Sequence, residues 1–483
     1  MLKDVVPFDR VWIALHGSSR SAEAVASFIR FLERRLGAEF VYDQARIGYT
    51  PFELIELLEL AETLRARDII RSYGRNPDLP DEPRVAHWYT EYVAEGHKKS
   101  AGSSLDDEPL ALTKALSEAL ERHLWYEHDQ FASLRSAPLS VMEREEAILH
   151  PMRFAGFSGS QRKQHPRLAF SSTDSFLWVK GYSWVGEKSV WVPAQIVSGH
   201  TKLRAFSPSS QEPVIRSSIT TGLATHPLRT NALLSGALEV IERDAYSITW
   251  MNQLTPPRMD IEELSKRSES LARLIARCHQ YRLLPHALRL PTDAPAYAVC
   301  AVLEDATGTL PRFSVGIKAN RNPERAVEGA LLEALRAHLG TRQRKLSPQN
   351  DWDPNTKAAA VMQYERLLYW AEEGRGDRLA FLIRGDIVPP VRELWEADTD
   401  AEHFTRIVAW CKEKGYELAS VPFTDAAANV PGWHIEFVVI PELQPLHYNE
   451  KFPYCGGDRL TEMPRQLGYS SREPYLDDPH PFA

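Results

Sequence analysis

The sequence predicts a mixed α/β (α+β) protein in which long helices pack on mixed sheets. Three long stretches have helical hydrophobic spacing, at Asp106–Glu127, Asn231–Trp250 and Pro323–Leu339. β-rich runs lie between them, as in Phe170–Val197 and Ala296–Leu303. The chain has 483 residues, of which 43% are hydrophobic and 25% charged. This composition is typical of globular proteins, and the length allows roughly two to four domains of about 150 residues.

The first part of the chain is expected to form a small N-terminal α/β domain (1–83), and the remainder a second domain (84–483). Tyr73–Pro83 is rich in proline, glycine and charge, which is typical of a linker. Two strands and two helices are predicted before it: Val11–His16, Glu39–Tyr42, Arg20–Leu36 and Pro51–Arg71. We hypothesise that this domain docks a partner or a precursor.

The elements of the second domain follow from local signals. Asp106 or Asp107 can cap the first long helix, and the glycines within Phe170–Val197 favour hairpins. From Pro441 onward the sequence has little periodicity, so irregular structure is expected. Further strands and helices are predicted at Ala296–Leu303, Arg312–Ile317, Ala358–Glu373 and Ala401–Lys414.

Composition and charge exclude several classes of protein. The formal net charge of −8 argues against a wholly basic nucleic-acid binder. No apolar run approaches the roughly 20 residues that span a bilayer, and charged residues occupy the place of a signal-peptide core. We therefore expect a cytoplasmic protein that binds neither nucleic acid nor membrane. The four cysteines are far apart and form no C-x-x-C pair, so no zinc knuckle or disulfide framework is indicated.

Two of the long helices carry the pattern E-x-x-E-R, in Glu118–Arg122 and Glu239–Arg243. Carboxylates three residues apart lie on one face of a helix. Four such groups could hold a hard cation such as Mg²⁺, which prefers carboxylate, phosphate and water oxygens. The adjacent arginines could each grip a phosphate oxygen. The pattern therefore indicates phosphate handling without a glycine-rich loop.

A simpler interpretation has to be weighed, because one such motif is usually a solvent-exposed face with an internal ion pair. The second motif lies among Leu238, Val240 and Ile241, so its helix is apolar on most faces. Unpaired glutamates on a buried helix are costly, and a metal with phosphate would remove that cost. Glu333 on the third helix adds a further acid. The run Ser217–Ala224 could present N–H groups and hydroxyls to an anion, or form a simple turn.

The order and spacing of these pieces resemble the YcaO-domain family, in particular the azoline-forming cyclodehydratases of thiazole/oxazole-modified peptide biosynthesis. Leu234–Ala245 (LSGALEVIERDA) is a nearly complete match to a family motif. The resemblance covers the chain from about Arg84 to its C-terminus and implies the YcaO fold. The other matching segments are Lys114–Arg122, Ser218–Ala224, Gly316–Arg336, His150–Gln161, Val192–Gln195 and Gly456–Gly468.

The resemblance implies that ATP and Mg²⁺ bind through glutamates rather than through a Walker loop. The positions that match the family's metal- and nucleotide-binding acids are Glu118, Glu121, Glu239, Glu242 and Glu333. Arg243 matches a phosphate-contacting arginine, and Arg122 is its counterpart on the first helix. Thr220 and Thr221 stand where the family usually has Ser and Asn, and Arg336 stands where Gln is common. We expect these three to contact the nucleotide.

The C-terminal sequence DPHPFA resembles the Pro-rich tail that reaches the active site in azoline-forming members. Proline fixes the backbone, so such a tail can hold a terminal carboxylate with little loss of entropy. The resemblance thus implies catalytic positions at Pro479, Pro481 and Ala483, where Ala483 replaces the usual final Pro, with the tail as a proton acceptor.

The implied activity is ATP-dependent formation of thiazoline or oxazoline from Cys, Ser or Thr of a ribosomal precursor peptide. The implied partners are that peptide, an E1-like leader-recognition protein and often a flavin-dependent azoline dehydrogenase, and relatives are commonly homodimers. Two alternatives remain. One is a relative that forms thioamides or amidines, against which Pro479 and Pro481 count. The other is a non-catalytic scaffold for peptide or partner, against which the five glutamates count.

Overall fold

The computed structural model describes residues 51–76, 81–94, 98–126, 134–199, 211–347, 350, 352–358, 361, 365–423 and 433–482. Internal contacts divide the chain into two compact units. Unit 1 contains the described residues before Asp81 together with Arg84–His123, and unit 2 contains Asp81–Pro83 and the chain from Leu124. The predicted elements before Pro51 lie outside the described residues. The predicted boundary at residue 83 stays a prediction.

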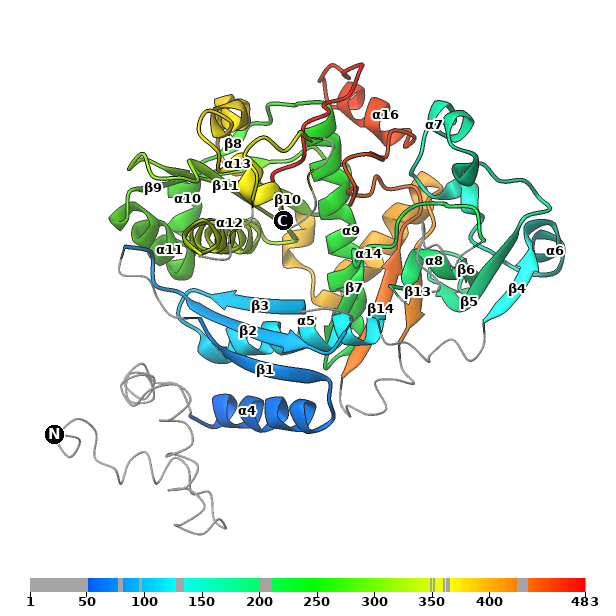
Figure 1. Cartoon of the computed structure of the whole chain (residues 1–483), viewed down its shortest axis with the longest axis horizontal. Coiled ribbons are helices and arrows are strands. Elements are labelled where there is room, and N and C mark those ends of the chain that lie inside the picture. Colours follow the sequence, from blue (N-terminus) through cyan, green and yellow to red (C-terminus); the bar gives the residue numbers. More distant parts are fainter. Residues whose placement is uncertain are drawn as a thin grey trace, which may run out of the picture. The chain divides into compact units, whose positions relative to one another are not determined.

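Unit 1 contains a three-stranded antiparallel sheet in the order β1-β2-β3 (Figure 1). The predicted helix at Pro51–Arg71 is confirmed, although it ends at Ala66 because β1 begins at Ile70. The expected linker from Tyr73 is wrong at its start, since Tyr73 lies in β1 and pairs with Thr90. The elements of the unit are α4 Pro51–Ala66, β1 Ile70–Arg75, β2 Ala86–Tyr92, β3 Lys98–Ser104 and α5 Glu108–Tyr126.

Helix α5 packs directly on β3. A Cβ on Gly102 would lie 2.0 Å from the carbonyl oxygen of Ala111, so only glycine permits this approach. The hydroxyls of Thr90 and Ser100 each lie 3.0 Å from the carbonyl oxygen of Ala115 and donate to it. The expected cap is confirmed at Asp107, whose Oδ1 accepts from the Leu110 N–H at 2.7 Å. These contacts fix the first E-x-x-E-R helix on its sheet.

Unit 2 contains two sheets. One has the order β4-β5-β13-β14-β7, with β6 paired to β5, and the other has the order β11-β10-β9-β8-β12. The hairpin expected within Phe170–Val197 is confirmed as β5 and β6. The strands are β4 Arg135–Pro138, β5 Ser175–Ser183, β6 Lys188–Pro193, β7 Leu223–His226, β8 Arg258–Met259, β9 Leu283–Arg289, β10 Tyr297–Asp305, β11 Phe313–Asn320, β12 Ile387–Val388, β13 Ala419–Pro422 and β14 His434–Val439.

Long and short helices accompany these sheets. The α-helices are α6 Leu139–Glu145, α7 Gly159–Gln164, α8 Ala194–Val197, α9 Arg229–Met251, α10 Ile261–Ser265, α11 Glu269–Gln280, α12 Pro323–Leu346, α13 Arg366–Trp370, α14 Asp400–Lys414 and α16 Arg459–Gln466. The 3₁₀-helices are η2 Pro151–Arg153, η3 Pro166–Leu168, η6 Gly376–Arg384 and η7 Leu394–Ala397. The helix predicted at Ala358–Glu373 is wrong in extent, because its described part is helical mainly in α13. Helix α16 interrupts the region expected to be irregular.

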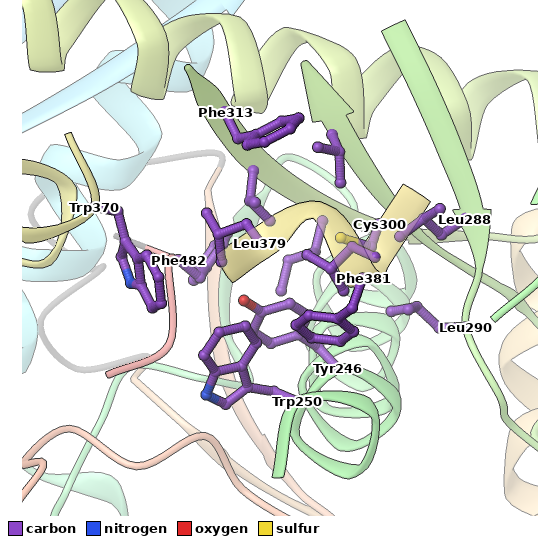
Figure 2. Close-up of a cluster of buried hydrophobic side chains, with 14 of the residues drawn as sticks. Tyr246, Trp250, Leu288, Leu290, Cys300, Phe313, Trp370, Leu379, Phe381 and Phe482 are labelled. Atoms are coloured by element: carbon purple, nitrogen blue, oxygen red, sulfur yellow. The ribbon is translucent and has the colours of Figure 1, made fainter. Parts of the chain in front are cut away.

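Helix α9 is the centre of unit 2 and contacts strands of both sheets (Figure 1). Its first half, including Leu234 and Ile241, packs in a core cluster with Val438 of β14 and residues of α14. Its second half, including Tyr246 and Trp250, packs in another cluster with residues of β10 and β11 (Figure 2). Burial on opposite sides explains why this helix is apolar over most of its surface. A polar side chain on α9 therefore needs a partner inside the fold.

Helix α12 covers β10 and β11. A Cβ on Gly316 of β11 would lie 2.2 Å from the carbonyl oxygen of Ala330 and 2.3 Å from the amide nitrogen of Ala334. Glycine in the strand and alanines in the helix thus bring the two backbones together. This close contact sets the distance between α12 and β11.

The contact at Gly316 gives a testable difference in stability. Gly316→Ala should lower the free energy of unfolding by about 2–3 kcal/mol, because the added methyl group has no space. Gly340→Ala is the matched control in α12, since a Cβ at this position would have open space within 4 Å; it should stabilise by about 0.5–1 kcal/mol. Urea denaturation of both variants measures these changes in the free energy of unfolding. Equal stability of the two would contradict the close packing.

Candidate active site

Glu239 is held at both carboxylate oxygens. Its Oε2 accepts a hydrogen bond from the Gly222 N–H at 3.1 Å, and its Oε1 accepts one from Nη2 of Arg243 at 3.2 Å. Arg243 lies one helical turn along α9, where an arginine can reach back to the acid. The side chain of Glu239 remains 25% exposed. It can therefore meet a ligand from solvent.

Glu242 lies deeper and is 2% exposed. Its Oε2 accepts from the Ala319 N–H of β11 at 2.8 Å, and Lys318 Nζ lies 3.8 Å from the same oxygen. Burial is the main reason that the pKa of Glu242 is raised to about 7; the charges of Lys318 and Arg243 lower it, and those of Glu333 and Glu239 raise it by less. Burial, and not a lack of neighbouring cations, thus makes ionisation of this carboxylate costly.

Glu333 reaches the same region from α12. Its Oε2 accepts from the Ile317 N–H of β11 at 2.9 Å, and its Oε1 accepts from Nη2 of Arg336 at 3.2 Å. Its charge acts on both Glu242 and Arg243. The structure therefore brings together the predicted acids Glu239, Glu242 and Glu333 with Arg243 and Arg336.

The three acids of unit 2 are held in the same way. Each anchors one carboxylate oxygen on a backbone N–H of a neighbouring strand or turn. In unit 1, Glu118 repeats this arrangement, because its Oε2 accepts from the Ala101 N–H at 3.1 Å and its Oε1 from Arg122 at 3.4 Å. Glu121 follows on the next turn of α5. A carboxylate fixed in this way is pre-oriented for a ligand and does not have to be ordered on binding.

Arg243 is the cation shared by the cluster. Its Nη2 bonds Glu239, and its Nη1 lies 3.2 Å from Glu242 Oε1 without forming a hydrogen bond. Burial lowers the pKa of Arg243, but the charges of Glu242, Glu239 and Glu333 outweigh this and raise it. One side of the guanidinium therefore retains capacity to bind an anion.

The turn that contains Thr220 and Thr221 lies beside Glu239. The Leu223 N–H donates to the Thr220 carbonyl at 2.9 Å, and Gly222 has φ +95°. A Cβ on Gly222 would lie 2.0 Å from the Val438 carbonyl oxygen, so this position requires glycine. Both threonines are half-buried. The predicted turn thus forms a wall of the cluster.

The C-terminal segment packs against the same helix. Trp370 Nε1 donates to the Pro479 carbonyl at 2.8 Å, and Pro479 and Pro481 are buried. The ring of Phe482 lies over Arg243, with 4.2 Å between its centroid and Cζ, and it joins the cluster that contains Tyr246 (Figure 2). Ala483 lies outside the described residues. The segment thus reaches the guanidinium at the centre of the cluster.

The sequence reasoning missed the residues that brace this cluster. Asp244 directly follows Arg243, is fully buried, and accepts two hydrogen bonds from Arg459 at 2.9 and 2.7 Å. Its Oδ1 also accepts from the Gln444 N–H at 2.7 Å. The sequence feature that could have indicated Asp244 is its position directly after the E-x-x-E-R motif. Its arginine partner lies 215 residues away, and no local pattern connects the two.

The fold and the cluster together define a mixed α/β protein with an acidic site of the kind that holds divalent cations and phosphates. A model of the YcaO cyclodehydratase family, described as ATP- and Mg²⁺-binding, matches residues 104–444. Since this is well over half of the sequence, the chain belongs to the YcaO cyclodehydratase family. The predicted family and the mixed fold are thereby confirmed, and the family's description agrees with the predicted cofactors ATP and Mg²⁺.

Solved structures share the fold. They include a heterocyclase in complex with substrate and cofactor, with a TM-score of 0.69 and 19% identity over 87% of this chain and 57% of that one. The YcaO protein of Methanopyrus kandleri, bound with AMPPCP and Mg²⁺, has a TM-score of 0.56 and 19% identity over 81% of this chain and 91% of its own. A subunit of the E. coli microcin synthetase McbBCD complex has a TM-score of 0.54 and 11% identity, covering 77% and 87% of the two chains.

An uncharacterised protein of Methanothermobacter thermautotrophicus is 26% identical over 171 residues, which are 34% of this chain and 43% of that protein. The chain thus spans less than half of this curated relative and 57% of the heterocyclase. Within the described ranges, no helix has both the length and the apolar character needed to cross a bilayer.

The raised pKa of Glu242 predicts a pH-dependent stability. The folded protein holds this proton up to about pH 7, whereas the unfolded chain releases it near pH 4.5. In chelator and without nucleotide, the free energy of unfolding should therefore fall as pH rises through this window, by up to about 3 kcal/mol from this group.

Glu242→Gln should flatten that dependence, because the amide does not titrate. Glu262→Gln, which alters an exposed acid of α10, is the control and should keep the wild-type slope. Chemical denaturation between about pH 4.5 and 7.5 measures how the free energy of unfolding depends on pH. Identical slopes for wild type and Glu242→Gln would contradict the assigned environment.

Proposed function

We propose that the chain is an ATP- and Mg²⁺-dependent cyclodehydratase that converts Cys, Ser or Thr residues of a ribosomal precursor peptide into thiazoline or oxazoline rings. One observation carries the proposal. Three carboxylates from two helices and the ring of Phe482 converge on Arg243. The family to which the chain belongs supports the use of ATP.

The proposed reaction begins when the substrate's sulfur or oxygen adds to the preceding carbonyl carbon. The former carbonyl oxygen then takes the γ-phosphoryl group of ATP, which is consumed as a co-substrate. Phosphate leaves with that oxygen, the amide nitrogen loses its proton, and the C=N bond of the azoline forms within the ring that the addition closed. Phosphoryl transfer of this kind depends mainly on positioning and on neutralising charge. Mg²⁺, when bound, offsets the charge of the phosphate oxygens.

The residues of unit 2 suit these tasks. Glu239, Glu242 and Glu333 would hold Mg²⁺, because each is oriented by a backbone N–H and their charges act on one another or on the shared Arg243. Arg243, whose Nη1 makes no hydrogen bond among the described residues, would bind the transferring phosphate. Thr220, Thr221 and Arg336 border the acids and would contact the nucleotide.

Other assignments rest on sequence motifs. We propose that Glu118, Glu121 and Arg122 supply further metal and nucleotide contacts, and that Pro479, Pro481 and Ala483 place the tail near the peptide as a proton acceptor. The proposed partners are the precursor peptide, an E1-like leader-recognition protein and a flavin-dependent dehydrogenase, with a homodimer as the assembly and the cytoplasm as the location. Residues 1–83 would dock a partner.

The rival functions differ in what they produce or consume. A thioamide-forming enzyme would exchange oxygen for sulfur when sulfide is supplied, and an amidine-forming one would join an amine to the carbonyl. A scaffold would bind peptide without consuming ATP. Phe482 over Arg243 favours the cyclodehydratase, because a packed tail leaves less room for an external nucleophile.

The test uses the full-length chain, its encoded precursor peptide and its partner protein. With ATP and Mg²⁺, mass spectrometry should show loss of one water per ring, and phosphate should be released. AMPPCP in place of ATP should stop the reaction. Exchange of oxygen for sulfur would establish the thioamide alternative, and peptide binding without ATP consumption would establish the scaffold.

Phe482 gives a second prediction about the same reaction. Phe482→Ala should uncover Arg243 to water, so ATP hydrolysed per ring formed should rise at least about twofold. Phe482→Leu is the matched control, since it retains an apolar cover and should stay closer to wild type. Coupled phosphate and mass measurements give the ratio. An unchanged ratio in Phe482→Ala would contradict a shielding role for the ring.

A further inference from the structure

A second cluster of metal-binding side chains lies beneath the C-terminal segment, apart from the glutamates. One nitrogen each of His447 and His480 and one carboxylate oxygen of Glu450 lie within 4.8 Å of one another. His480 is fully buried, His447 is 5% exposed, and the Glu450 side chain is 3% exposed. Such a group of buried polar side chains that could ligate a metal needs an explanation.

The hydrogen bonds define which ring nitrogens carry protons. His447 Nε2 lies 2.9 Å from Glu450 Oε2, and His480 Nε2 lies 3.1 Å from the His447 carbonyl oxygen. Because a carbonyl accepts, His480 Nε2 is a donor and its Nδ1 keeps a lone pair, whereas His447 Nε2 and Glu450 Oε2 share one proton, which a metal ion would replace. Neither Nδ1 has a hydrogen-bond partner in the described part of the chain.

This pattern is the one that metal-binding histidines show. Such a histidine typically donates its other N–H to a carboxylate or a backbone carbonyl, which fixes the ring. His480 has such a partner, the backbone carbonyl of His447. Burial, with Arg366 and His447 nearby, lowers the pKa of His480 well below its usual value, so the imidazole is neutral, as ligation requires.

The surrounding charges select the type of metal. Arg366 Nε lies 2.6 Å from Glu450 Oε1, and Arg243 also acts electrostatically on His480. Two arginines and a single carboxylate disfavour Mg²⁺ or Ca²⁺, which require several oxygen ligands. Two imidazoles and a carboxylate suit Zn²⁺.

We propose that His447, Glu450 and His480 form a Zn²⁺-class site that fastens the C-terminal segment to the fold. His480 lies two residues before Phe482, so a metal here holds the ring over Arg243. The side chains close around the ion by small rotations, since the ligand atoms must come nearer than 4.8 Å for tetrahedral coordination. This site is separate from the proposed Mg²⁺ site and does not depend on the proposed reaction.

The test measures metal binding to the full-length chain without a histidine tag. Protein grown with zinc should contain about one Zn²⁺ per chain by elemental analysis. After chelation, Co²⁺ should give the visible absorption of a tetrahedral site, and Zn²⁺ should raise the melting temperature. His480→Gln and His447→Gln should each weaken Co²⁺ binding at least about tenfold.

Two controls keep the result specific. His403→Gln removes a buried histidine whose Nε2 also meets a backbone carbonyl and whose Nδ1 is also unpaired within the described ranges, and it should bind Co²⁺ like wild type. Glu239→Gln should keep the zinc while altering the proposed Mg²⁺ site. Absence of Co²⁺ binding by folded wild type, or equal binding by wild type, His480→Gln and His447→Gln, would overturn the proposal.

Discussion

The burial of Glu242 is the constraint on which the rest of the site depends. Helix α9 is enclosed by two sheets, so a carboxylate on it must find partners inside the fold. It finds the Ala319 N–H of β11 and the guanidinium of Arg243. The strand that supplies this N–H also supplies the one that anchors Glu333. The close contact of Gly316 with α12 then fixes the spacing of the acids.

The negative charge that Glu239, Glu242 and Glu333 bring to one region of the fold calls for compensation. Arg243 supplies part of it, and Phe482 covers its guanidinium. Divalent cations and phosphates would complete the balance, which is the chemistry of the family to which the chain belongs. The segment before Phe482 is held by hydrogen bonds from two tryptophan indoles to its backbone carbonyls and from His480 to the His447 carbonyl. These buried polar contacts order the segment that carries the Phe482 ring.

The sequence was most informative where periodicity and motif coincide. Helices α5, α9 and α12 could be predicted because their apolar spacing is long and regular. Motif spacing placed Glu239 and Glu242 on one helix face, whereas Glu333 was joined to them only through the family resemblance. The length of α13 was overestimated, because the apolar pattern of Ala358–Glu373 favours a helix throughout, whereas the described part of this range is helical mainly at Arg366–Trp370. The Asp244–Arg459 pair and the His447–His480 contact were not predicted, because each joins segments whose proximity arises only from tertiary packing.

Calorimetric titration of ATP with Mg²⁺ tests the central claim most directly. We predict that wild type binds, and that Glu239→Gln weakens binding several-fold or more, because each carboxylate contributes to cation affinity. The exposed-site variant Glu262→Gln should bind like wild type. Equal binding by wild type and Glu239→Gln, or no binding by folded wild type with its partner protein present, would contradict the assignment of these glutamates to the nucleotide and metal.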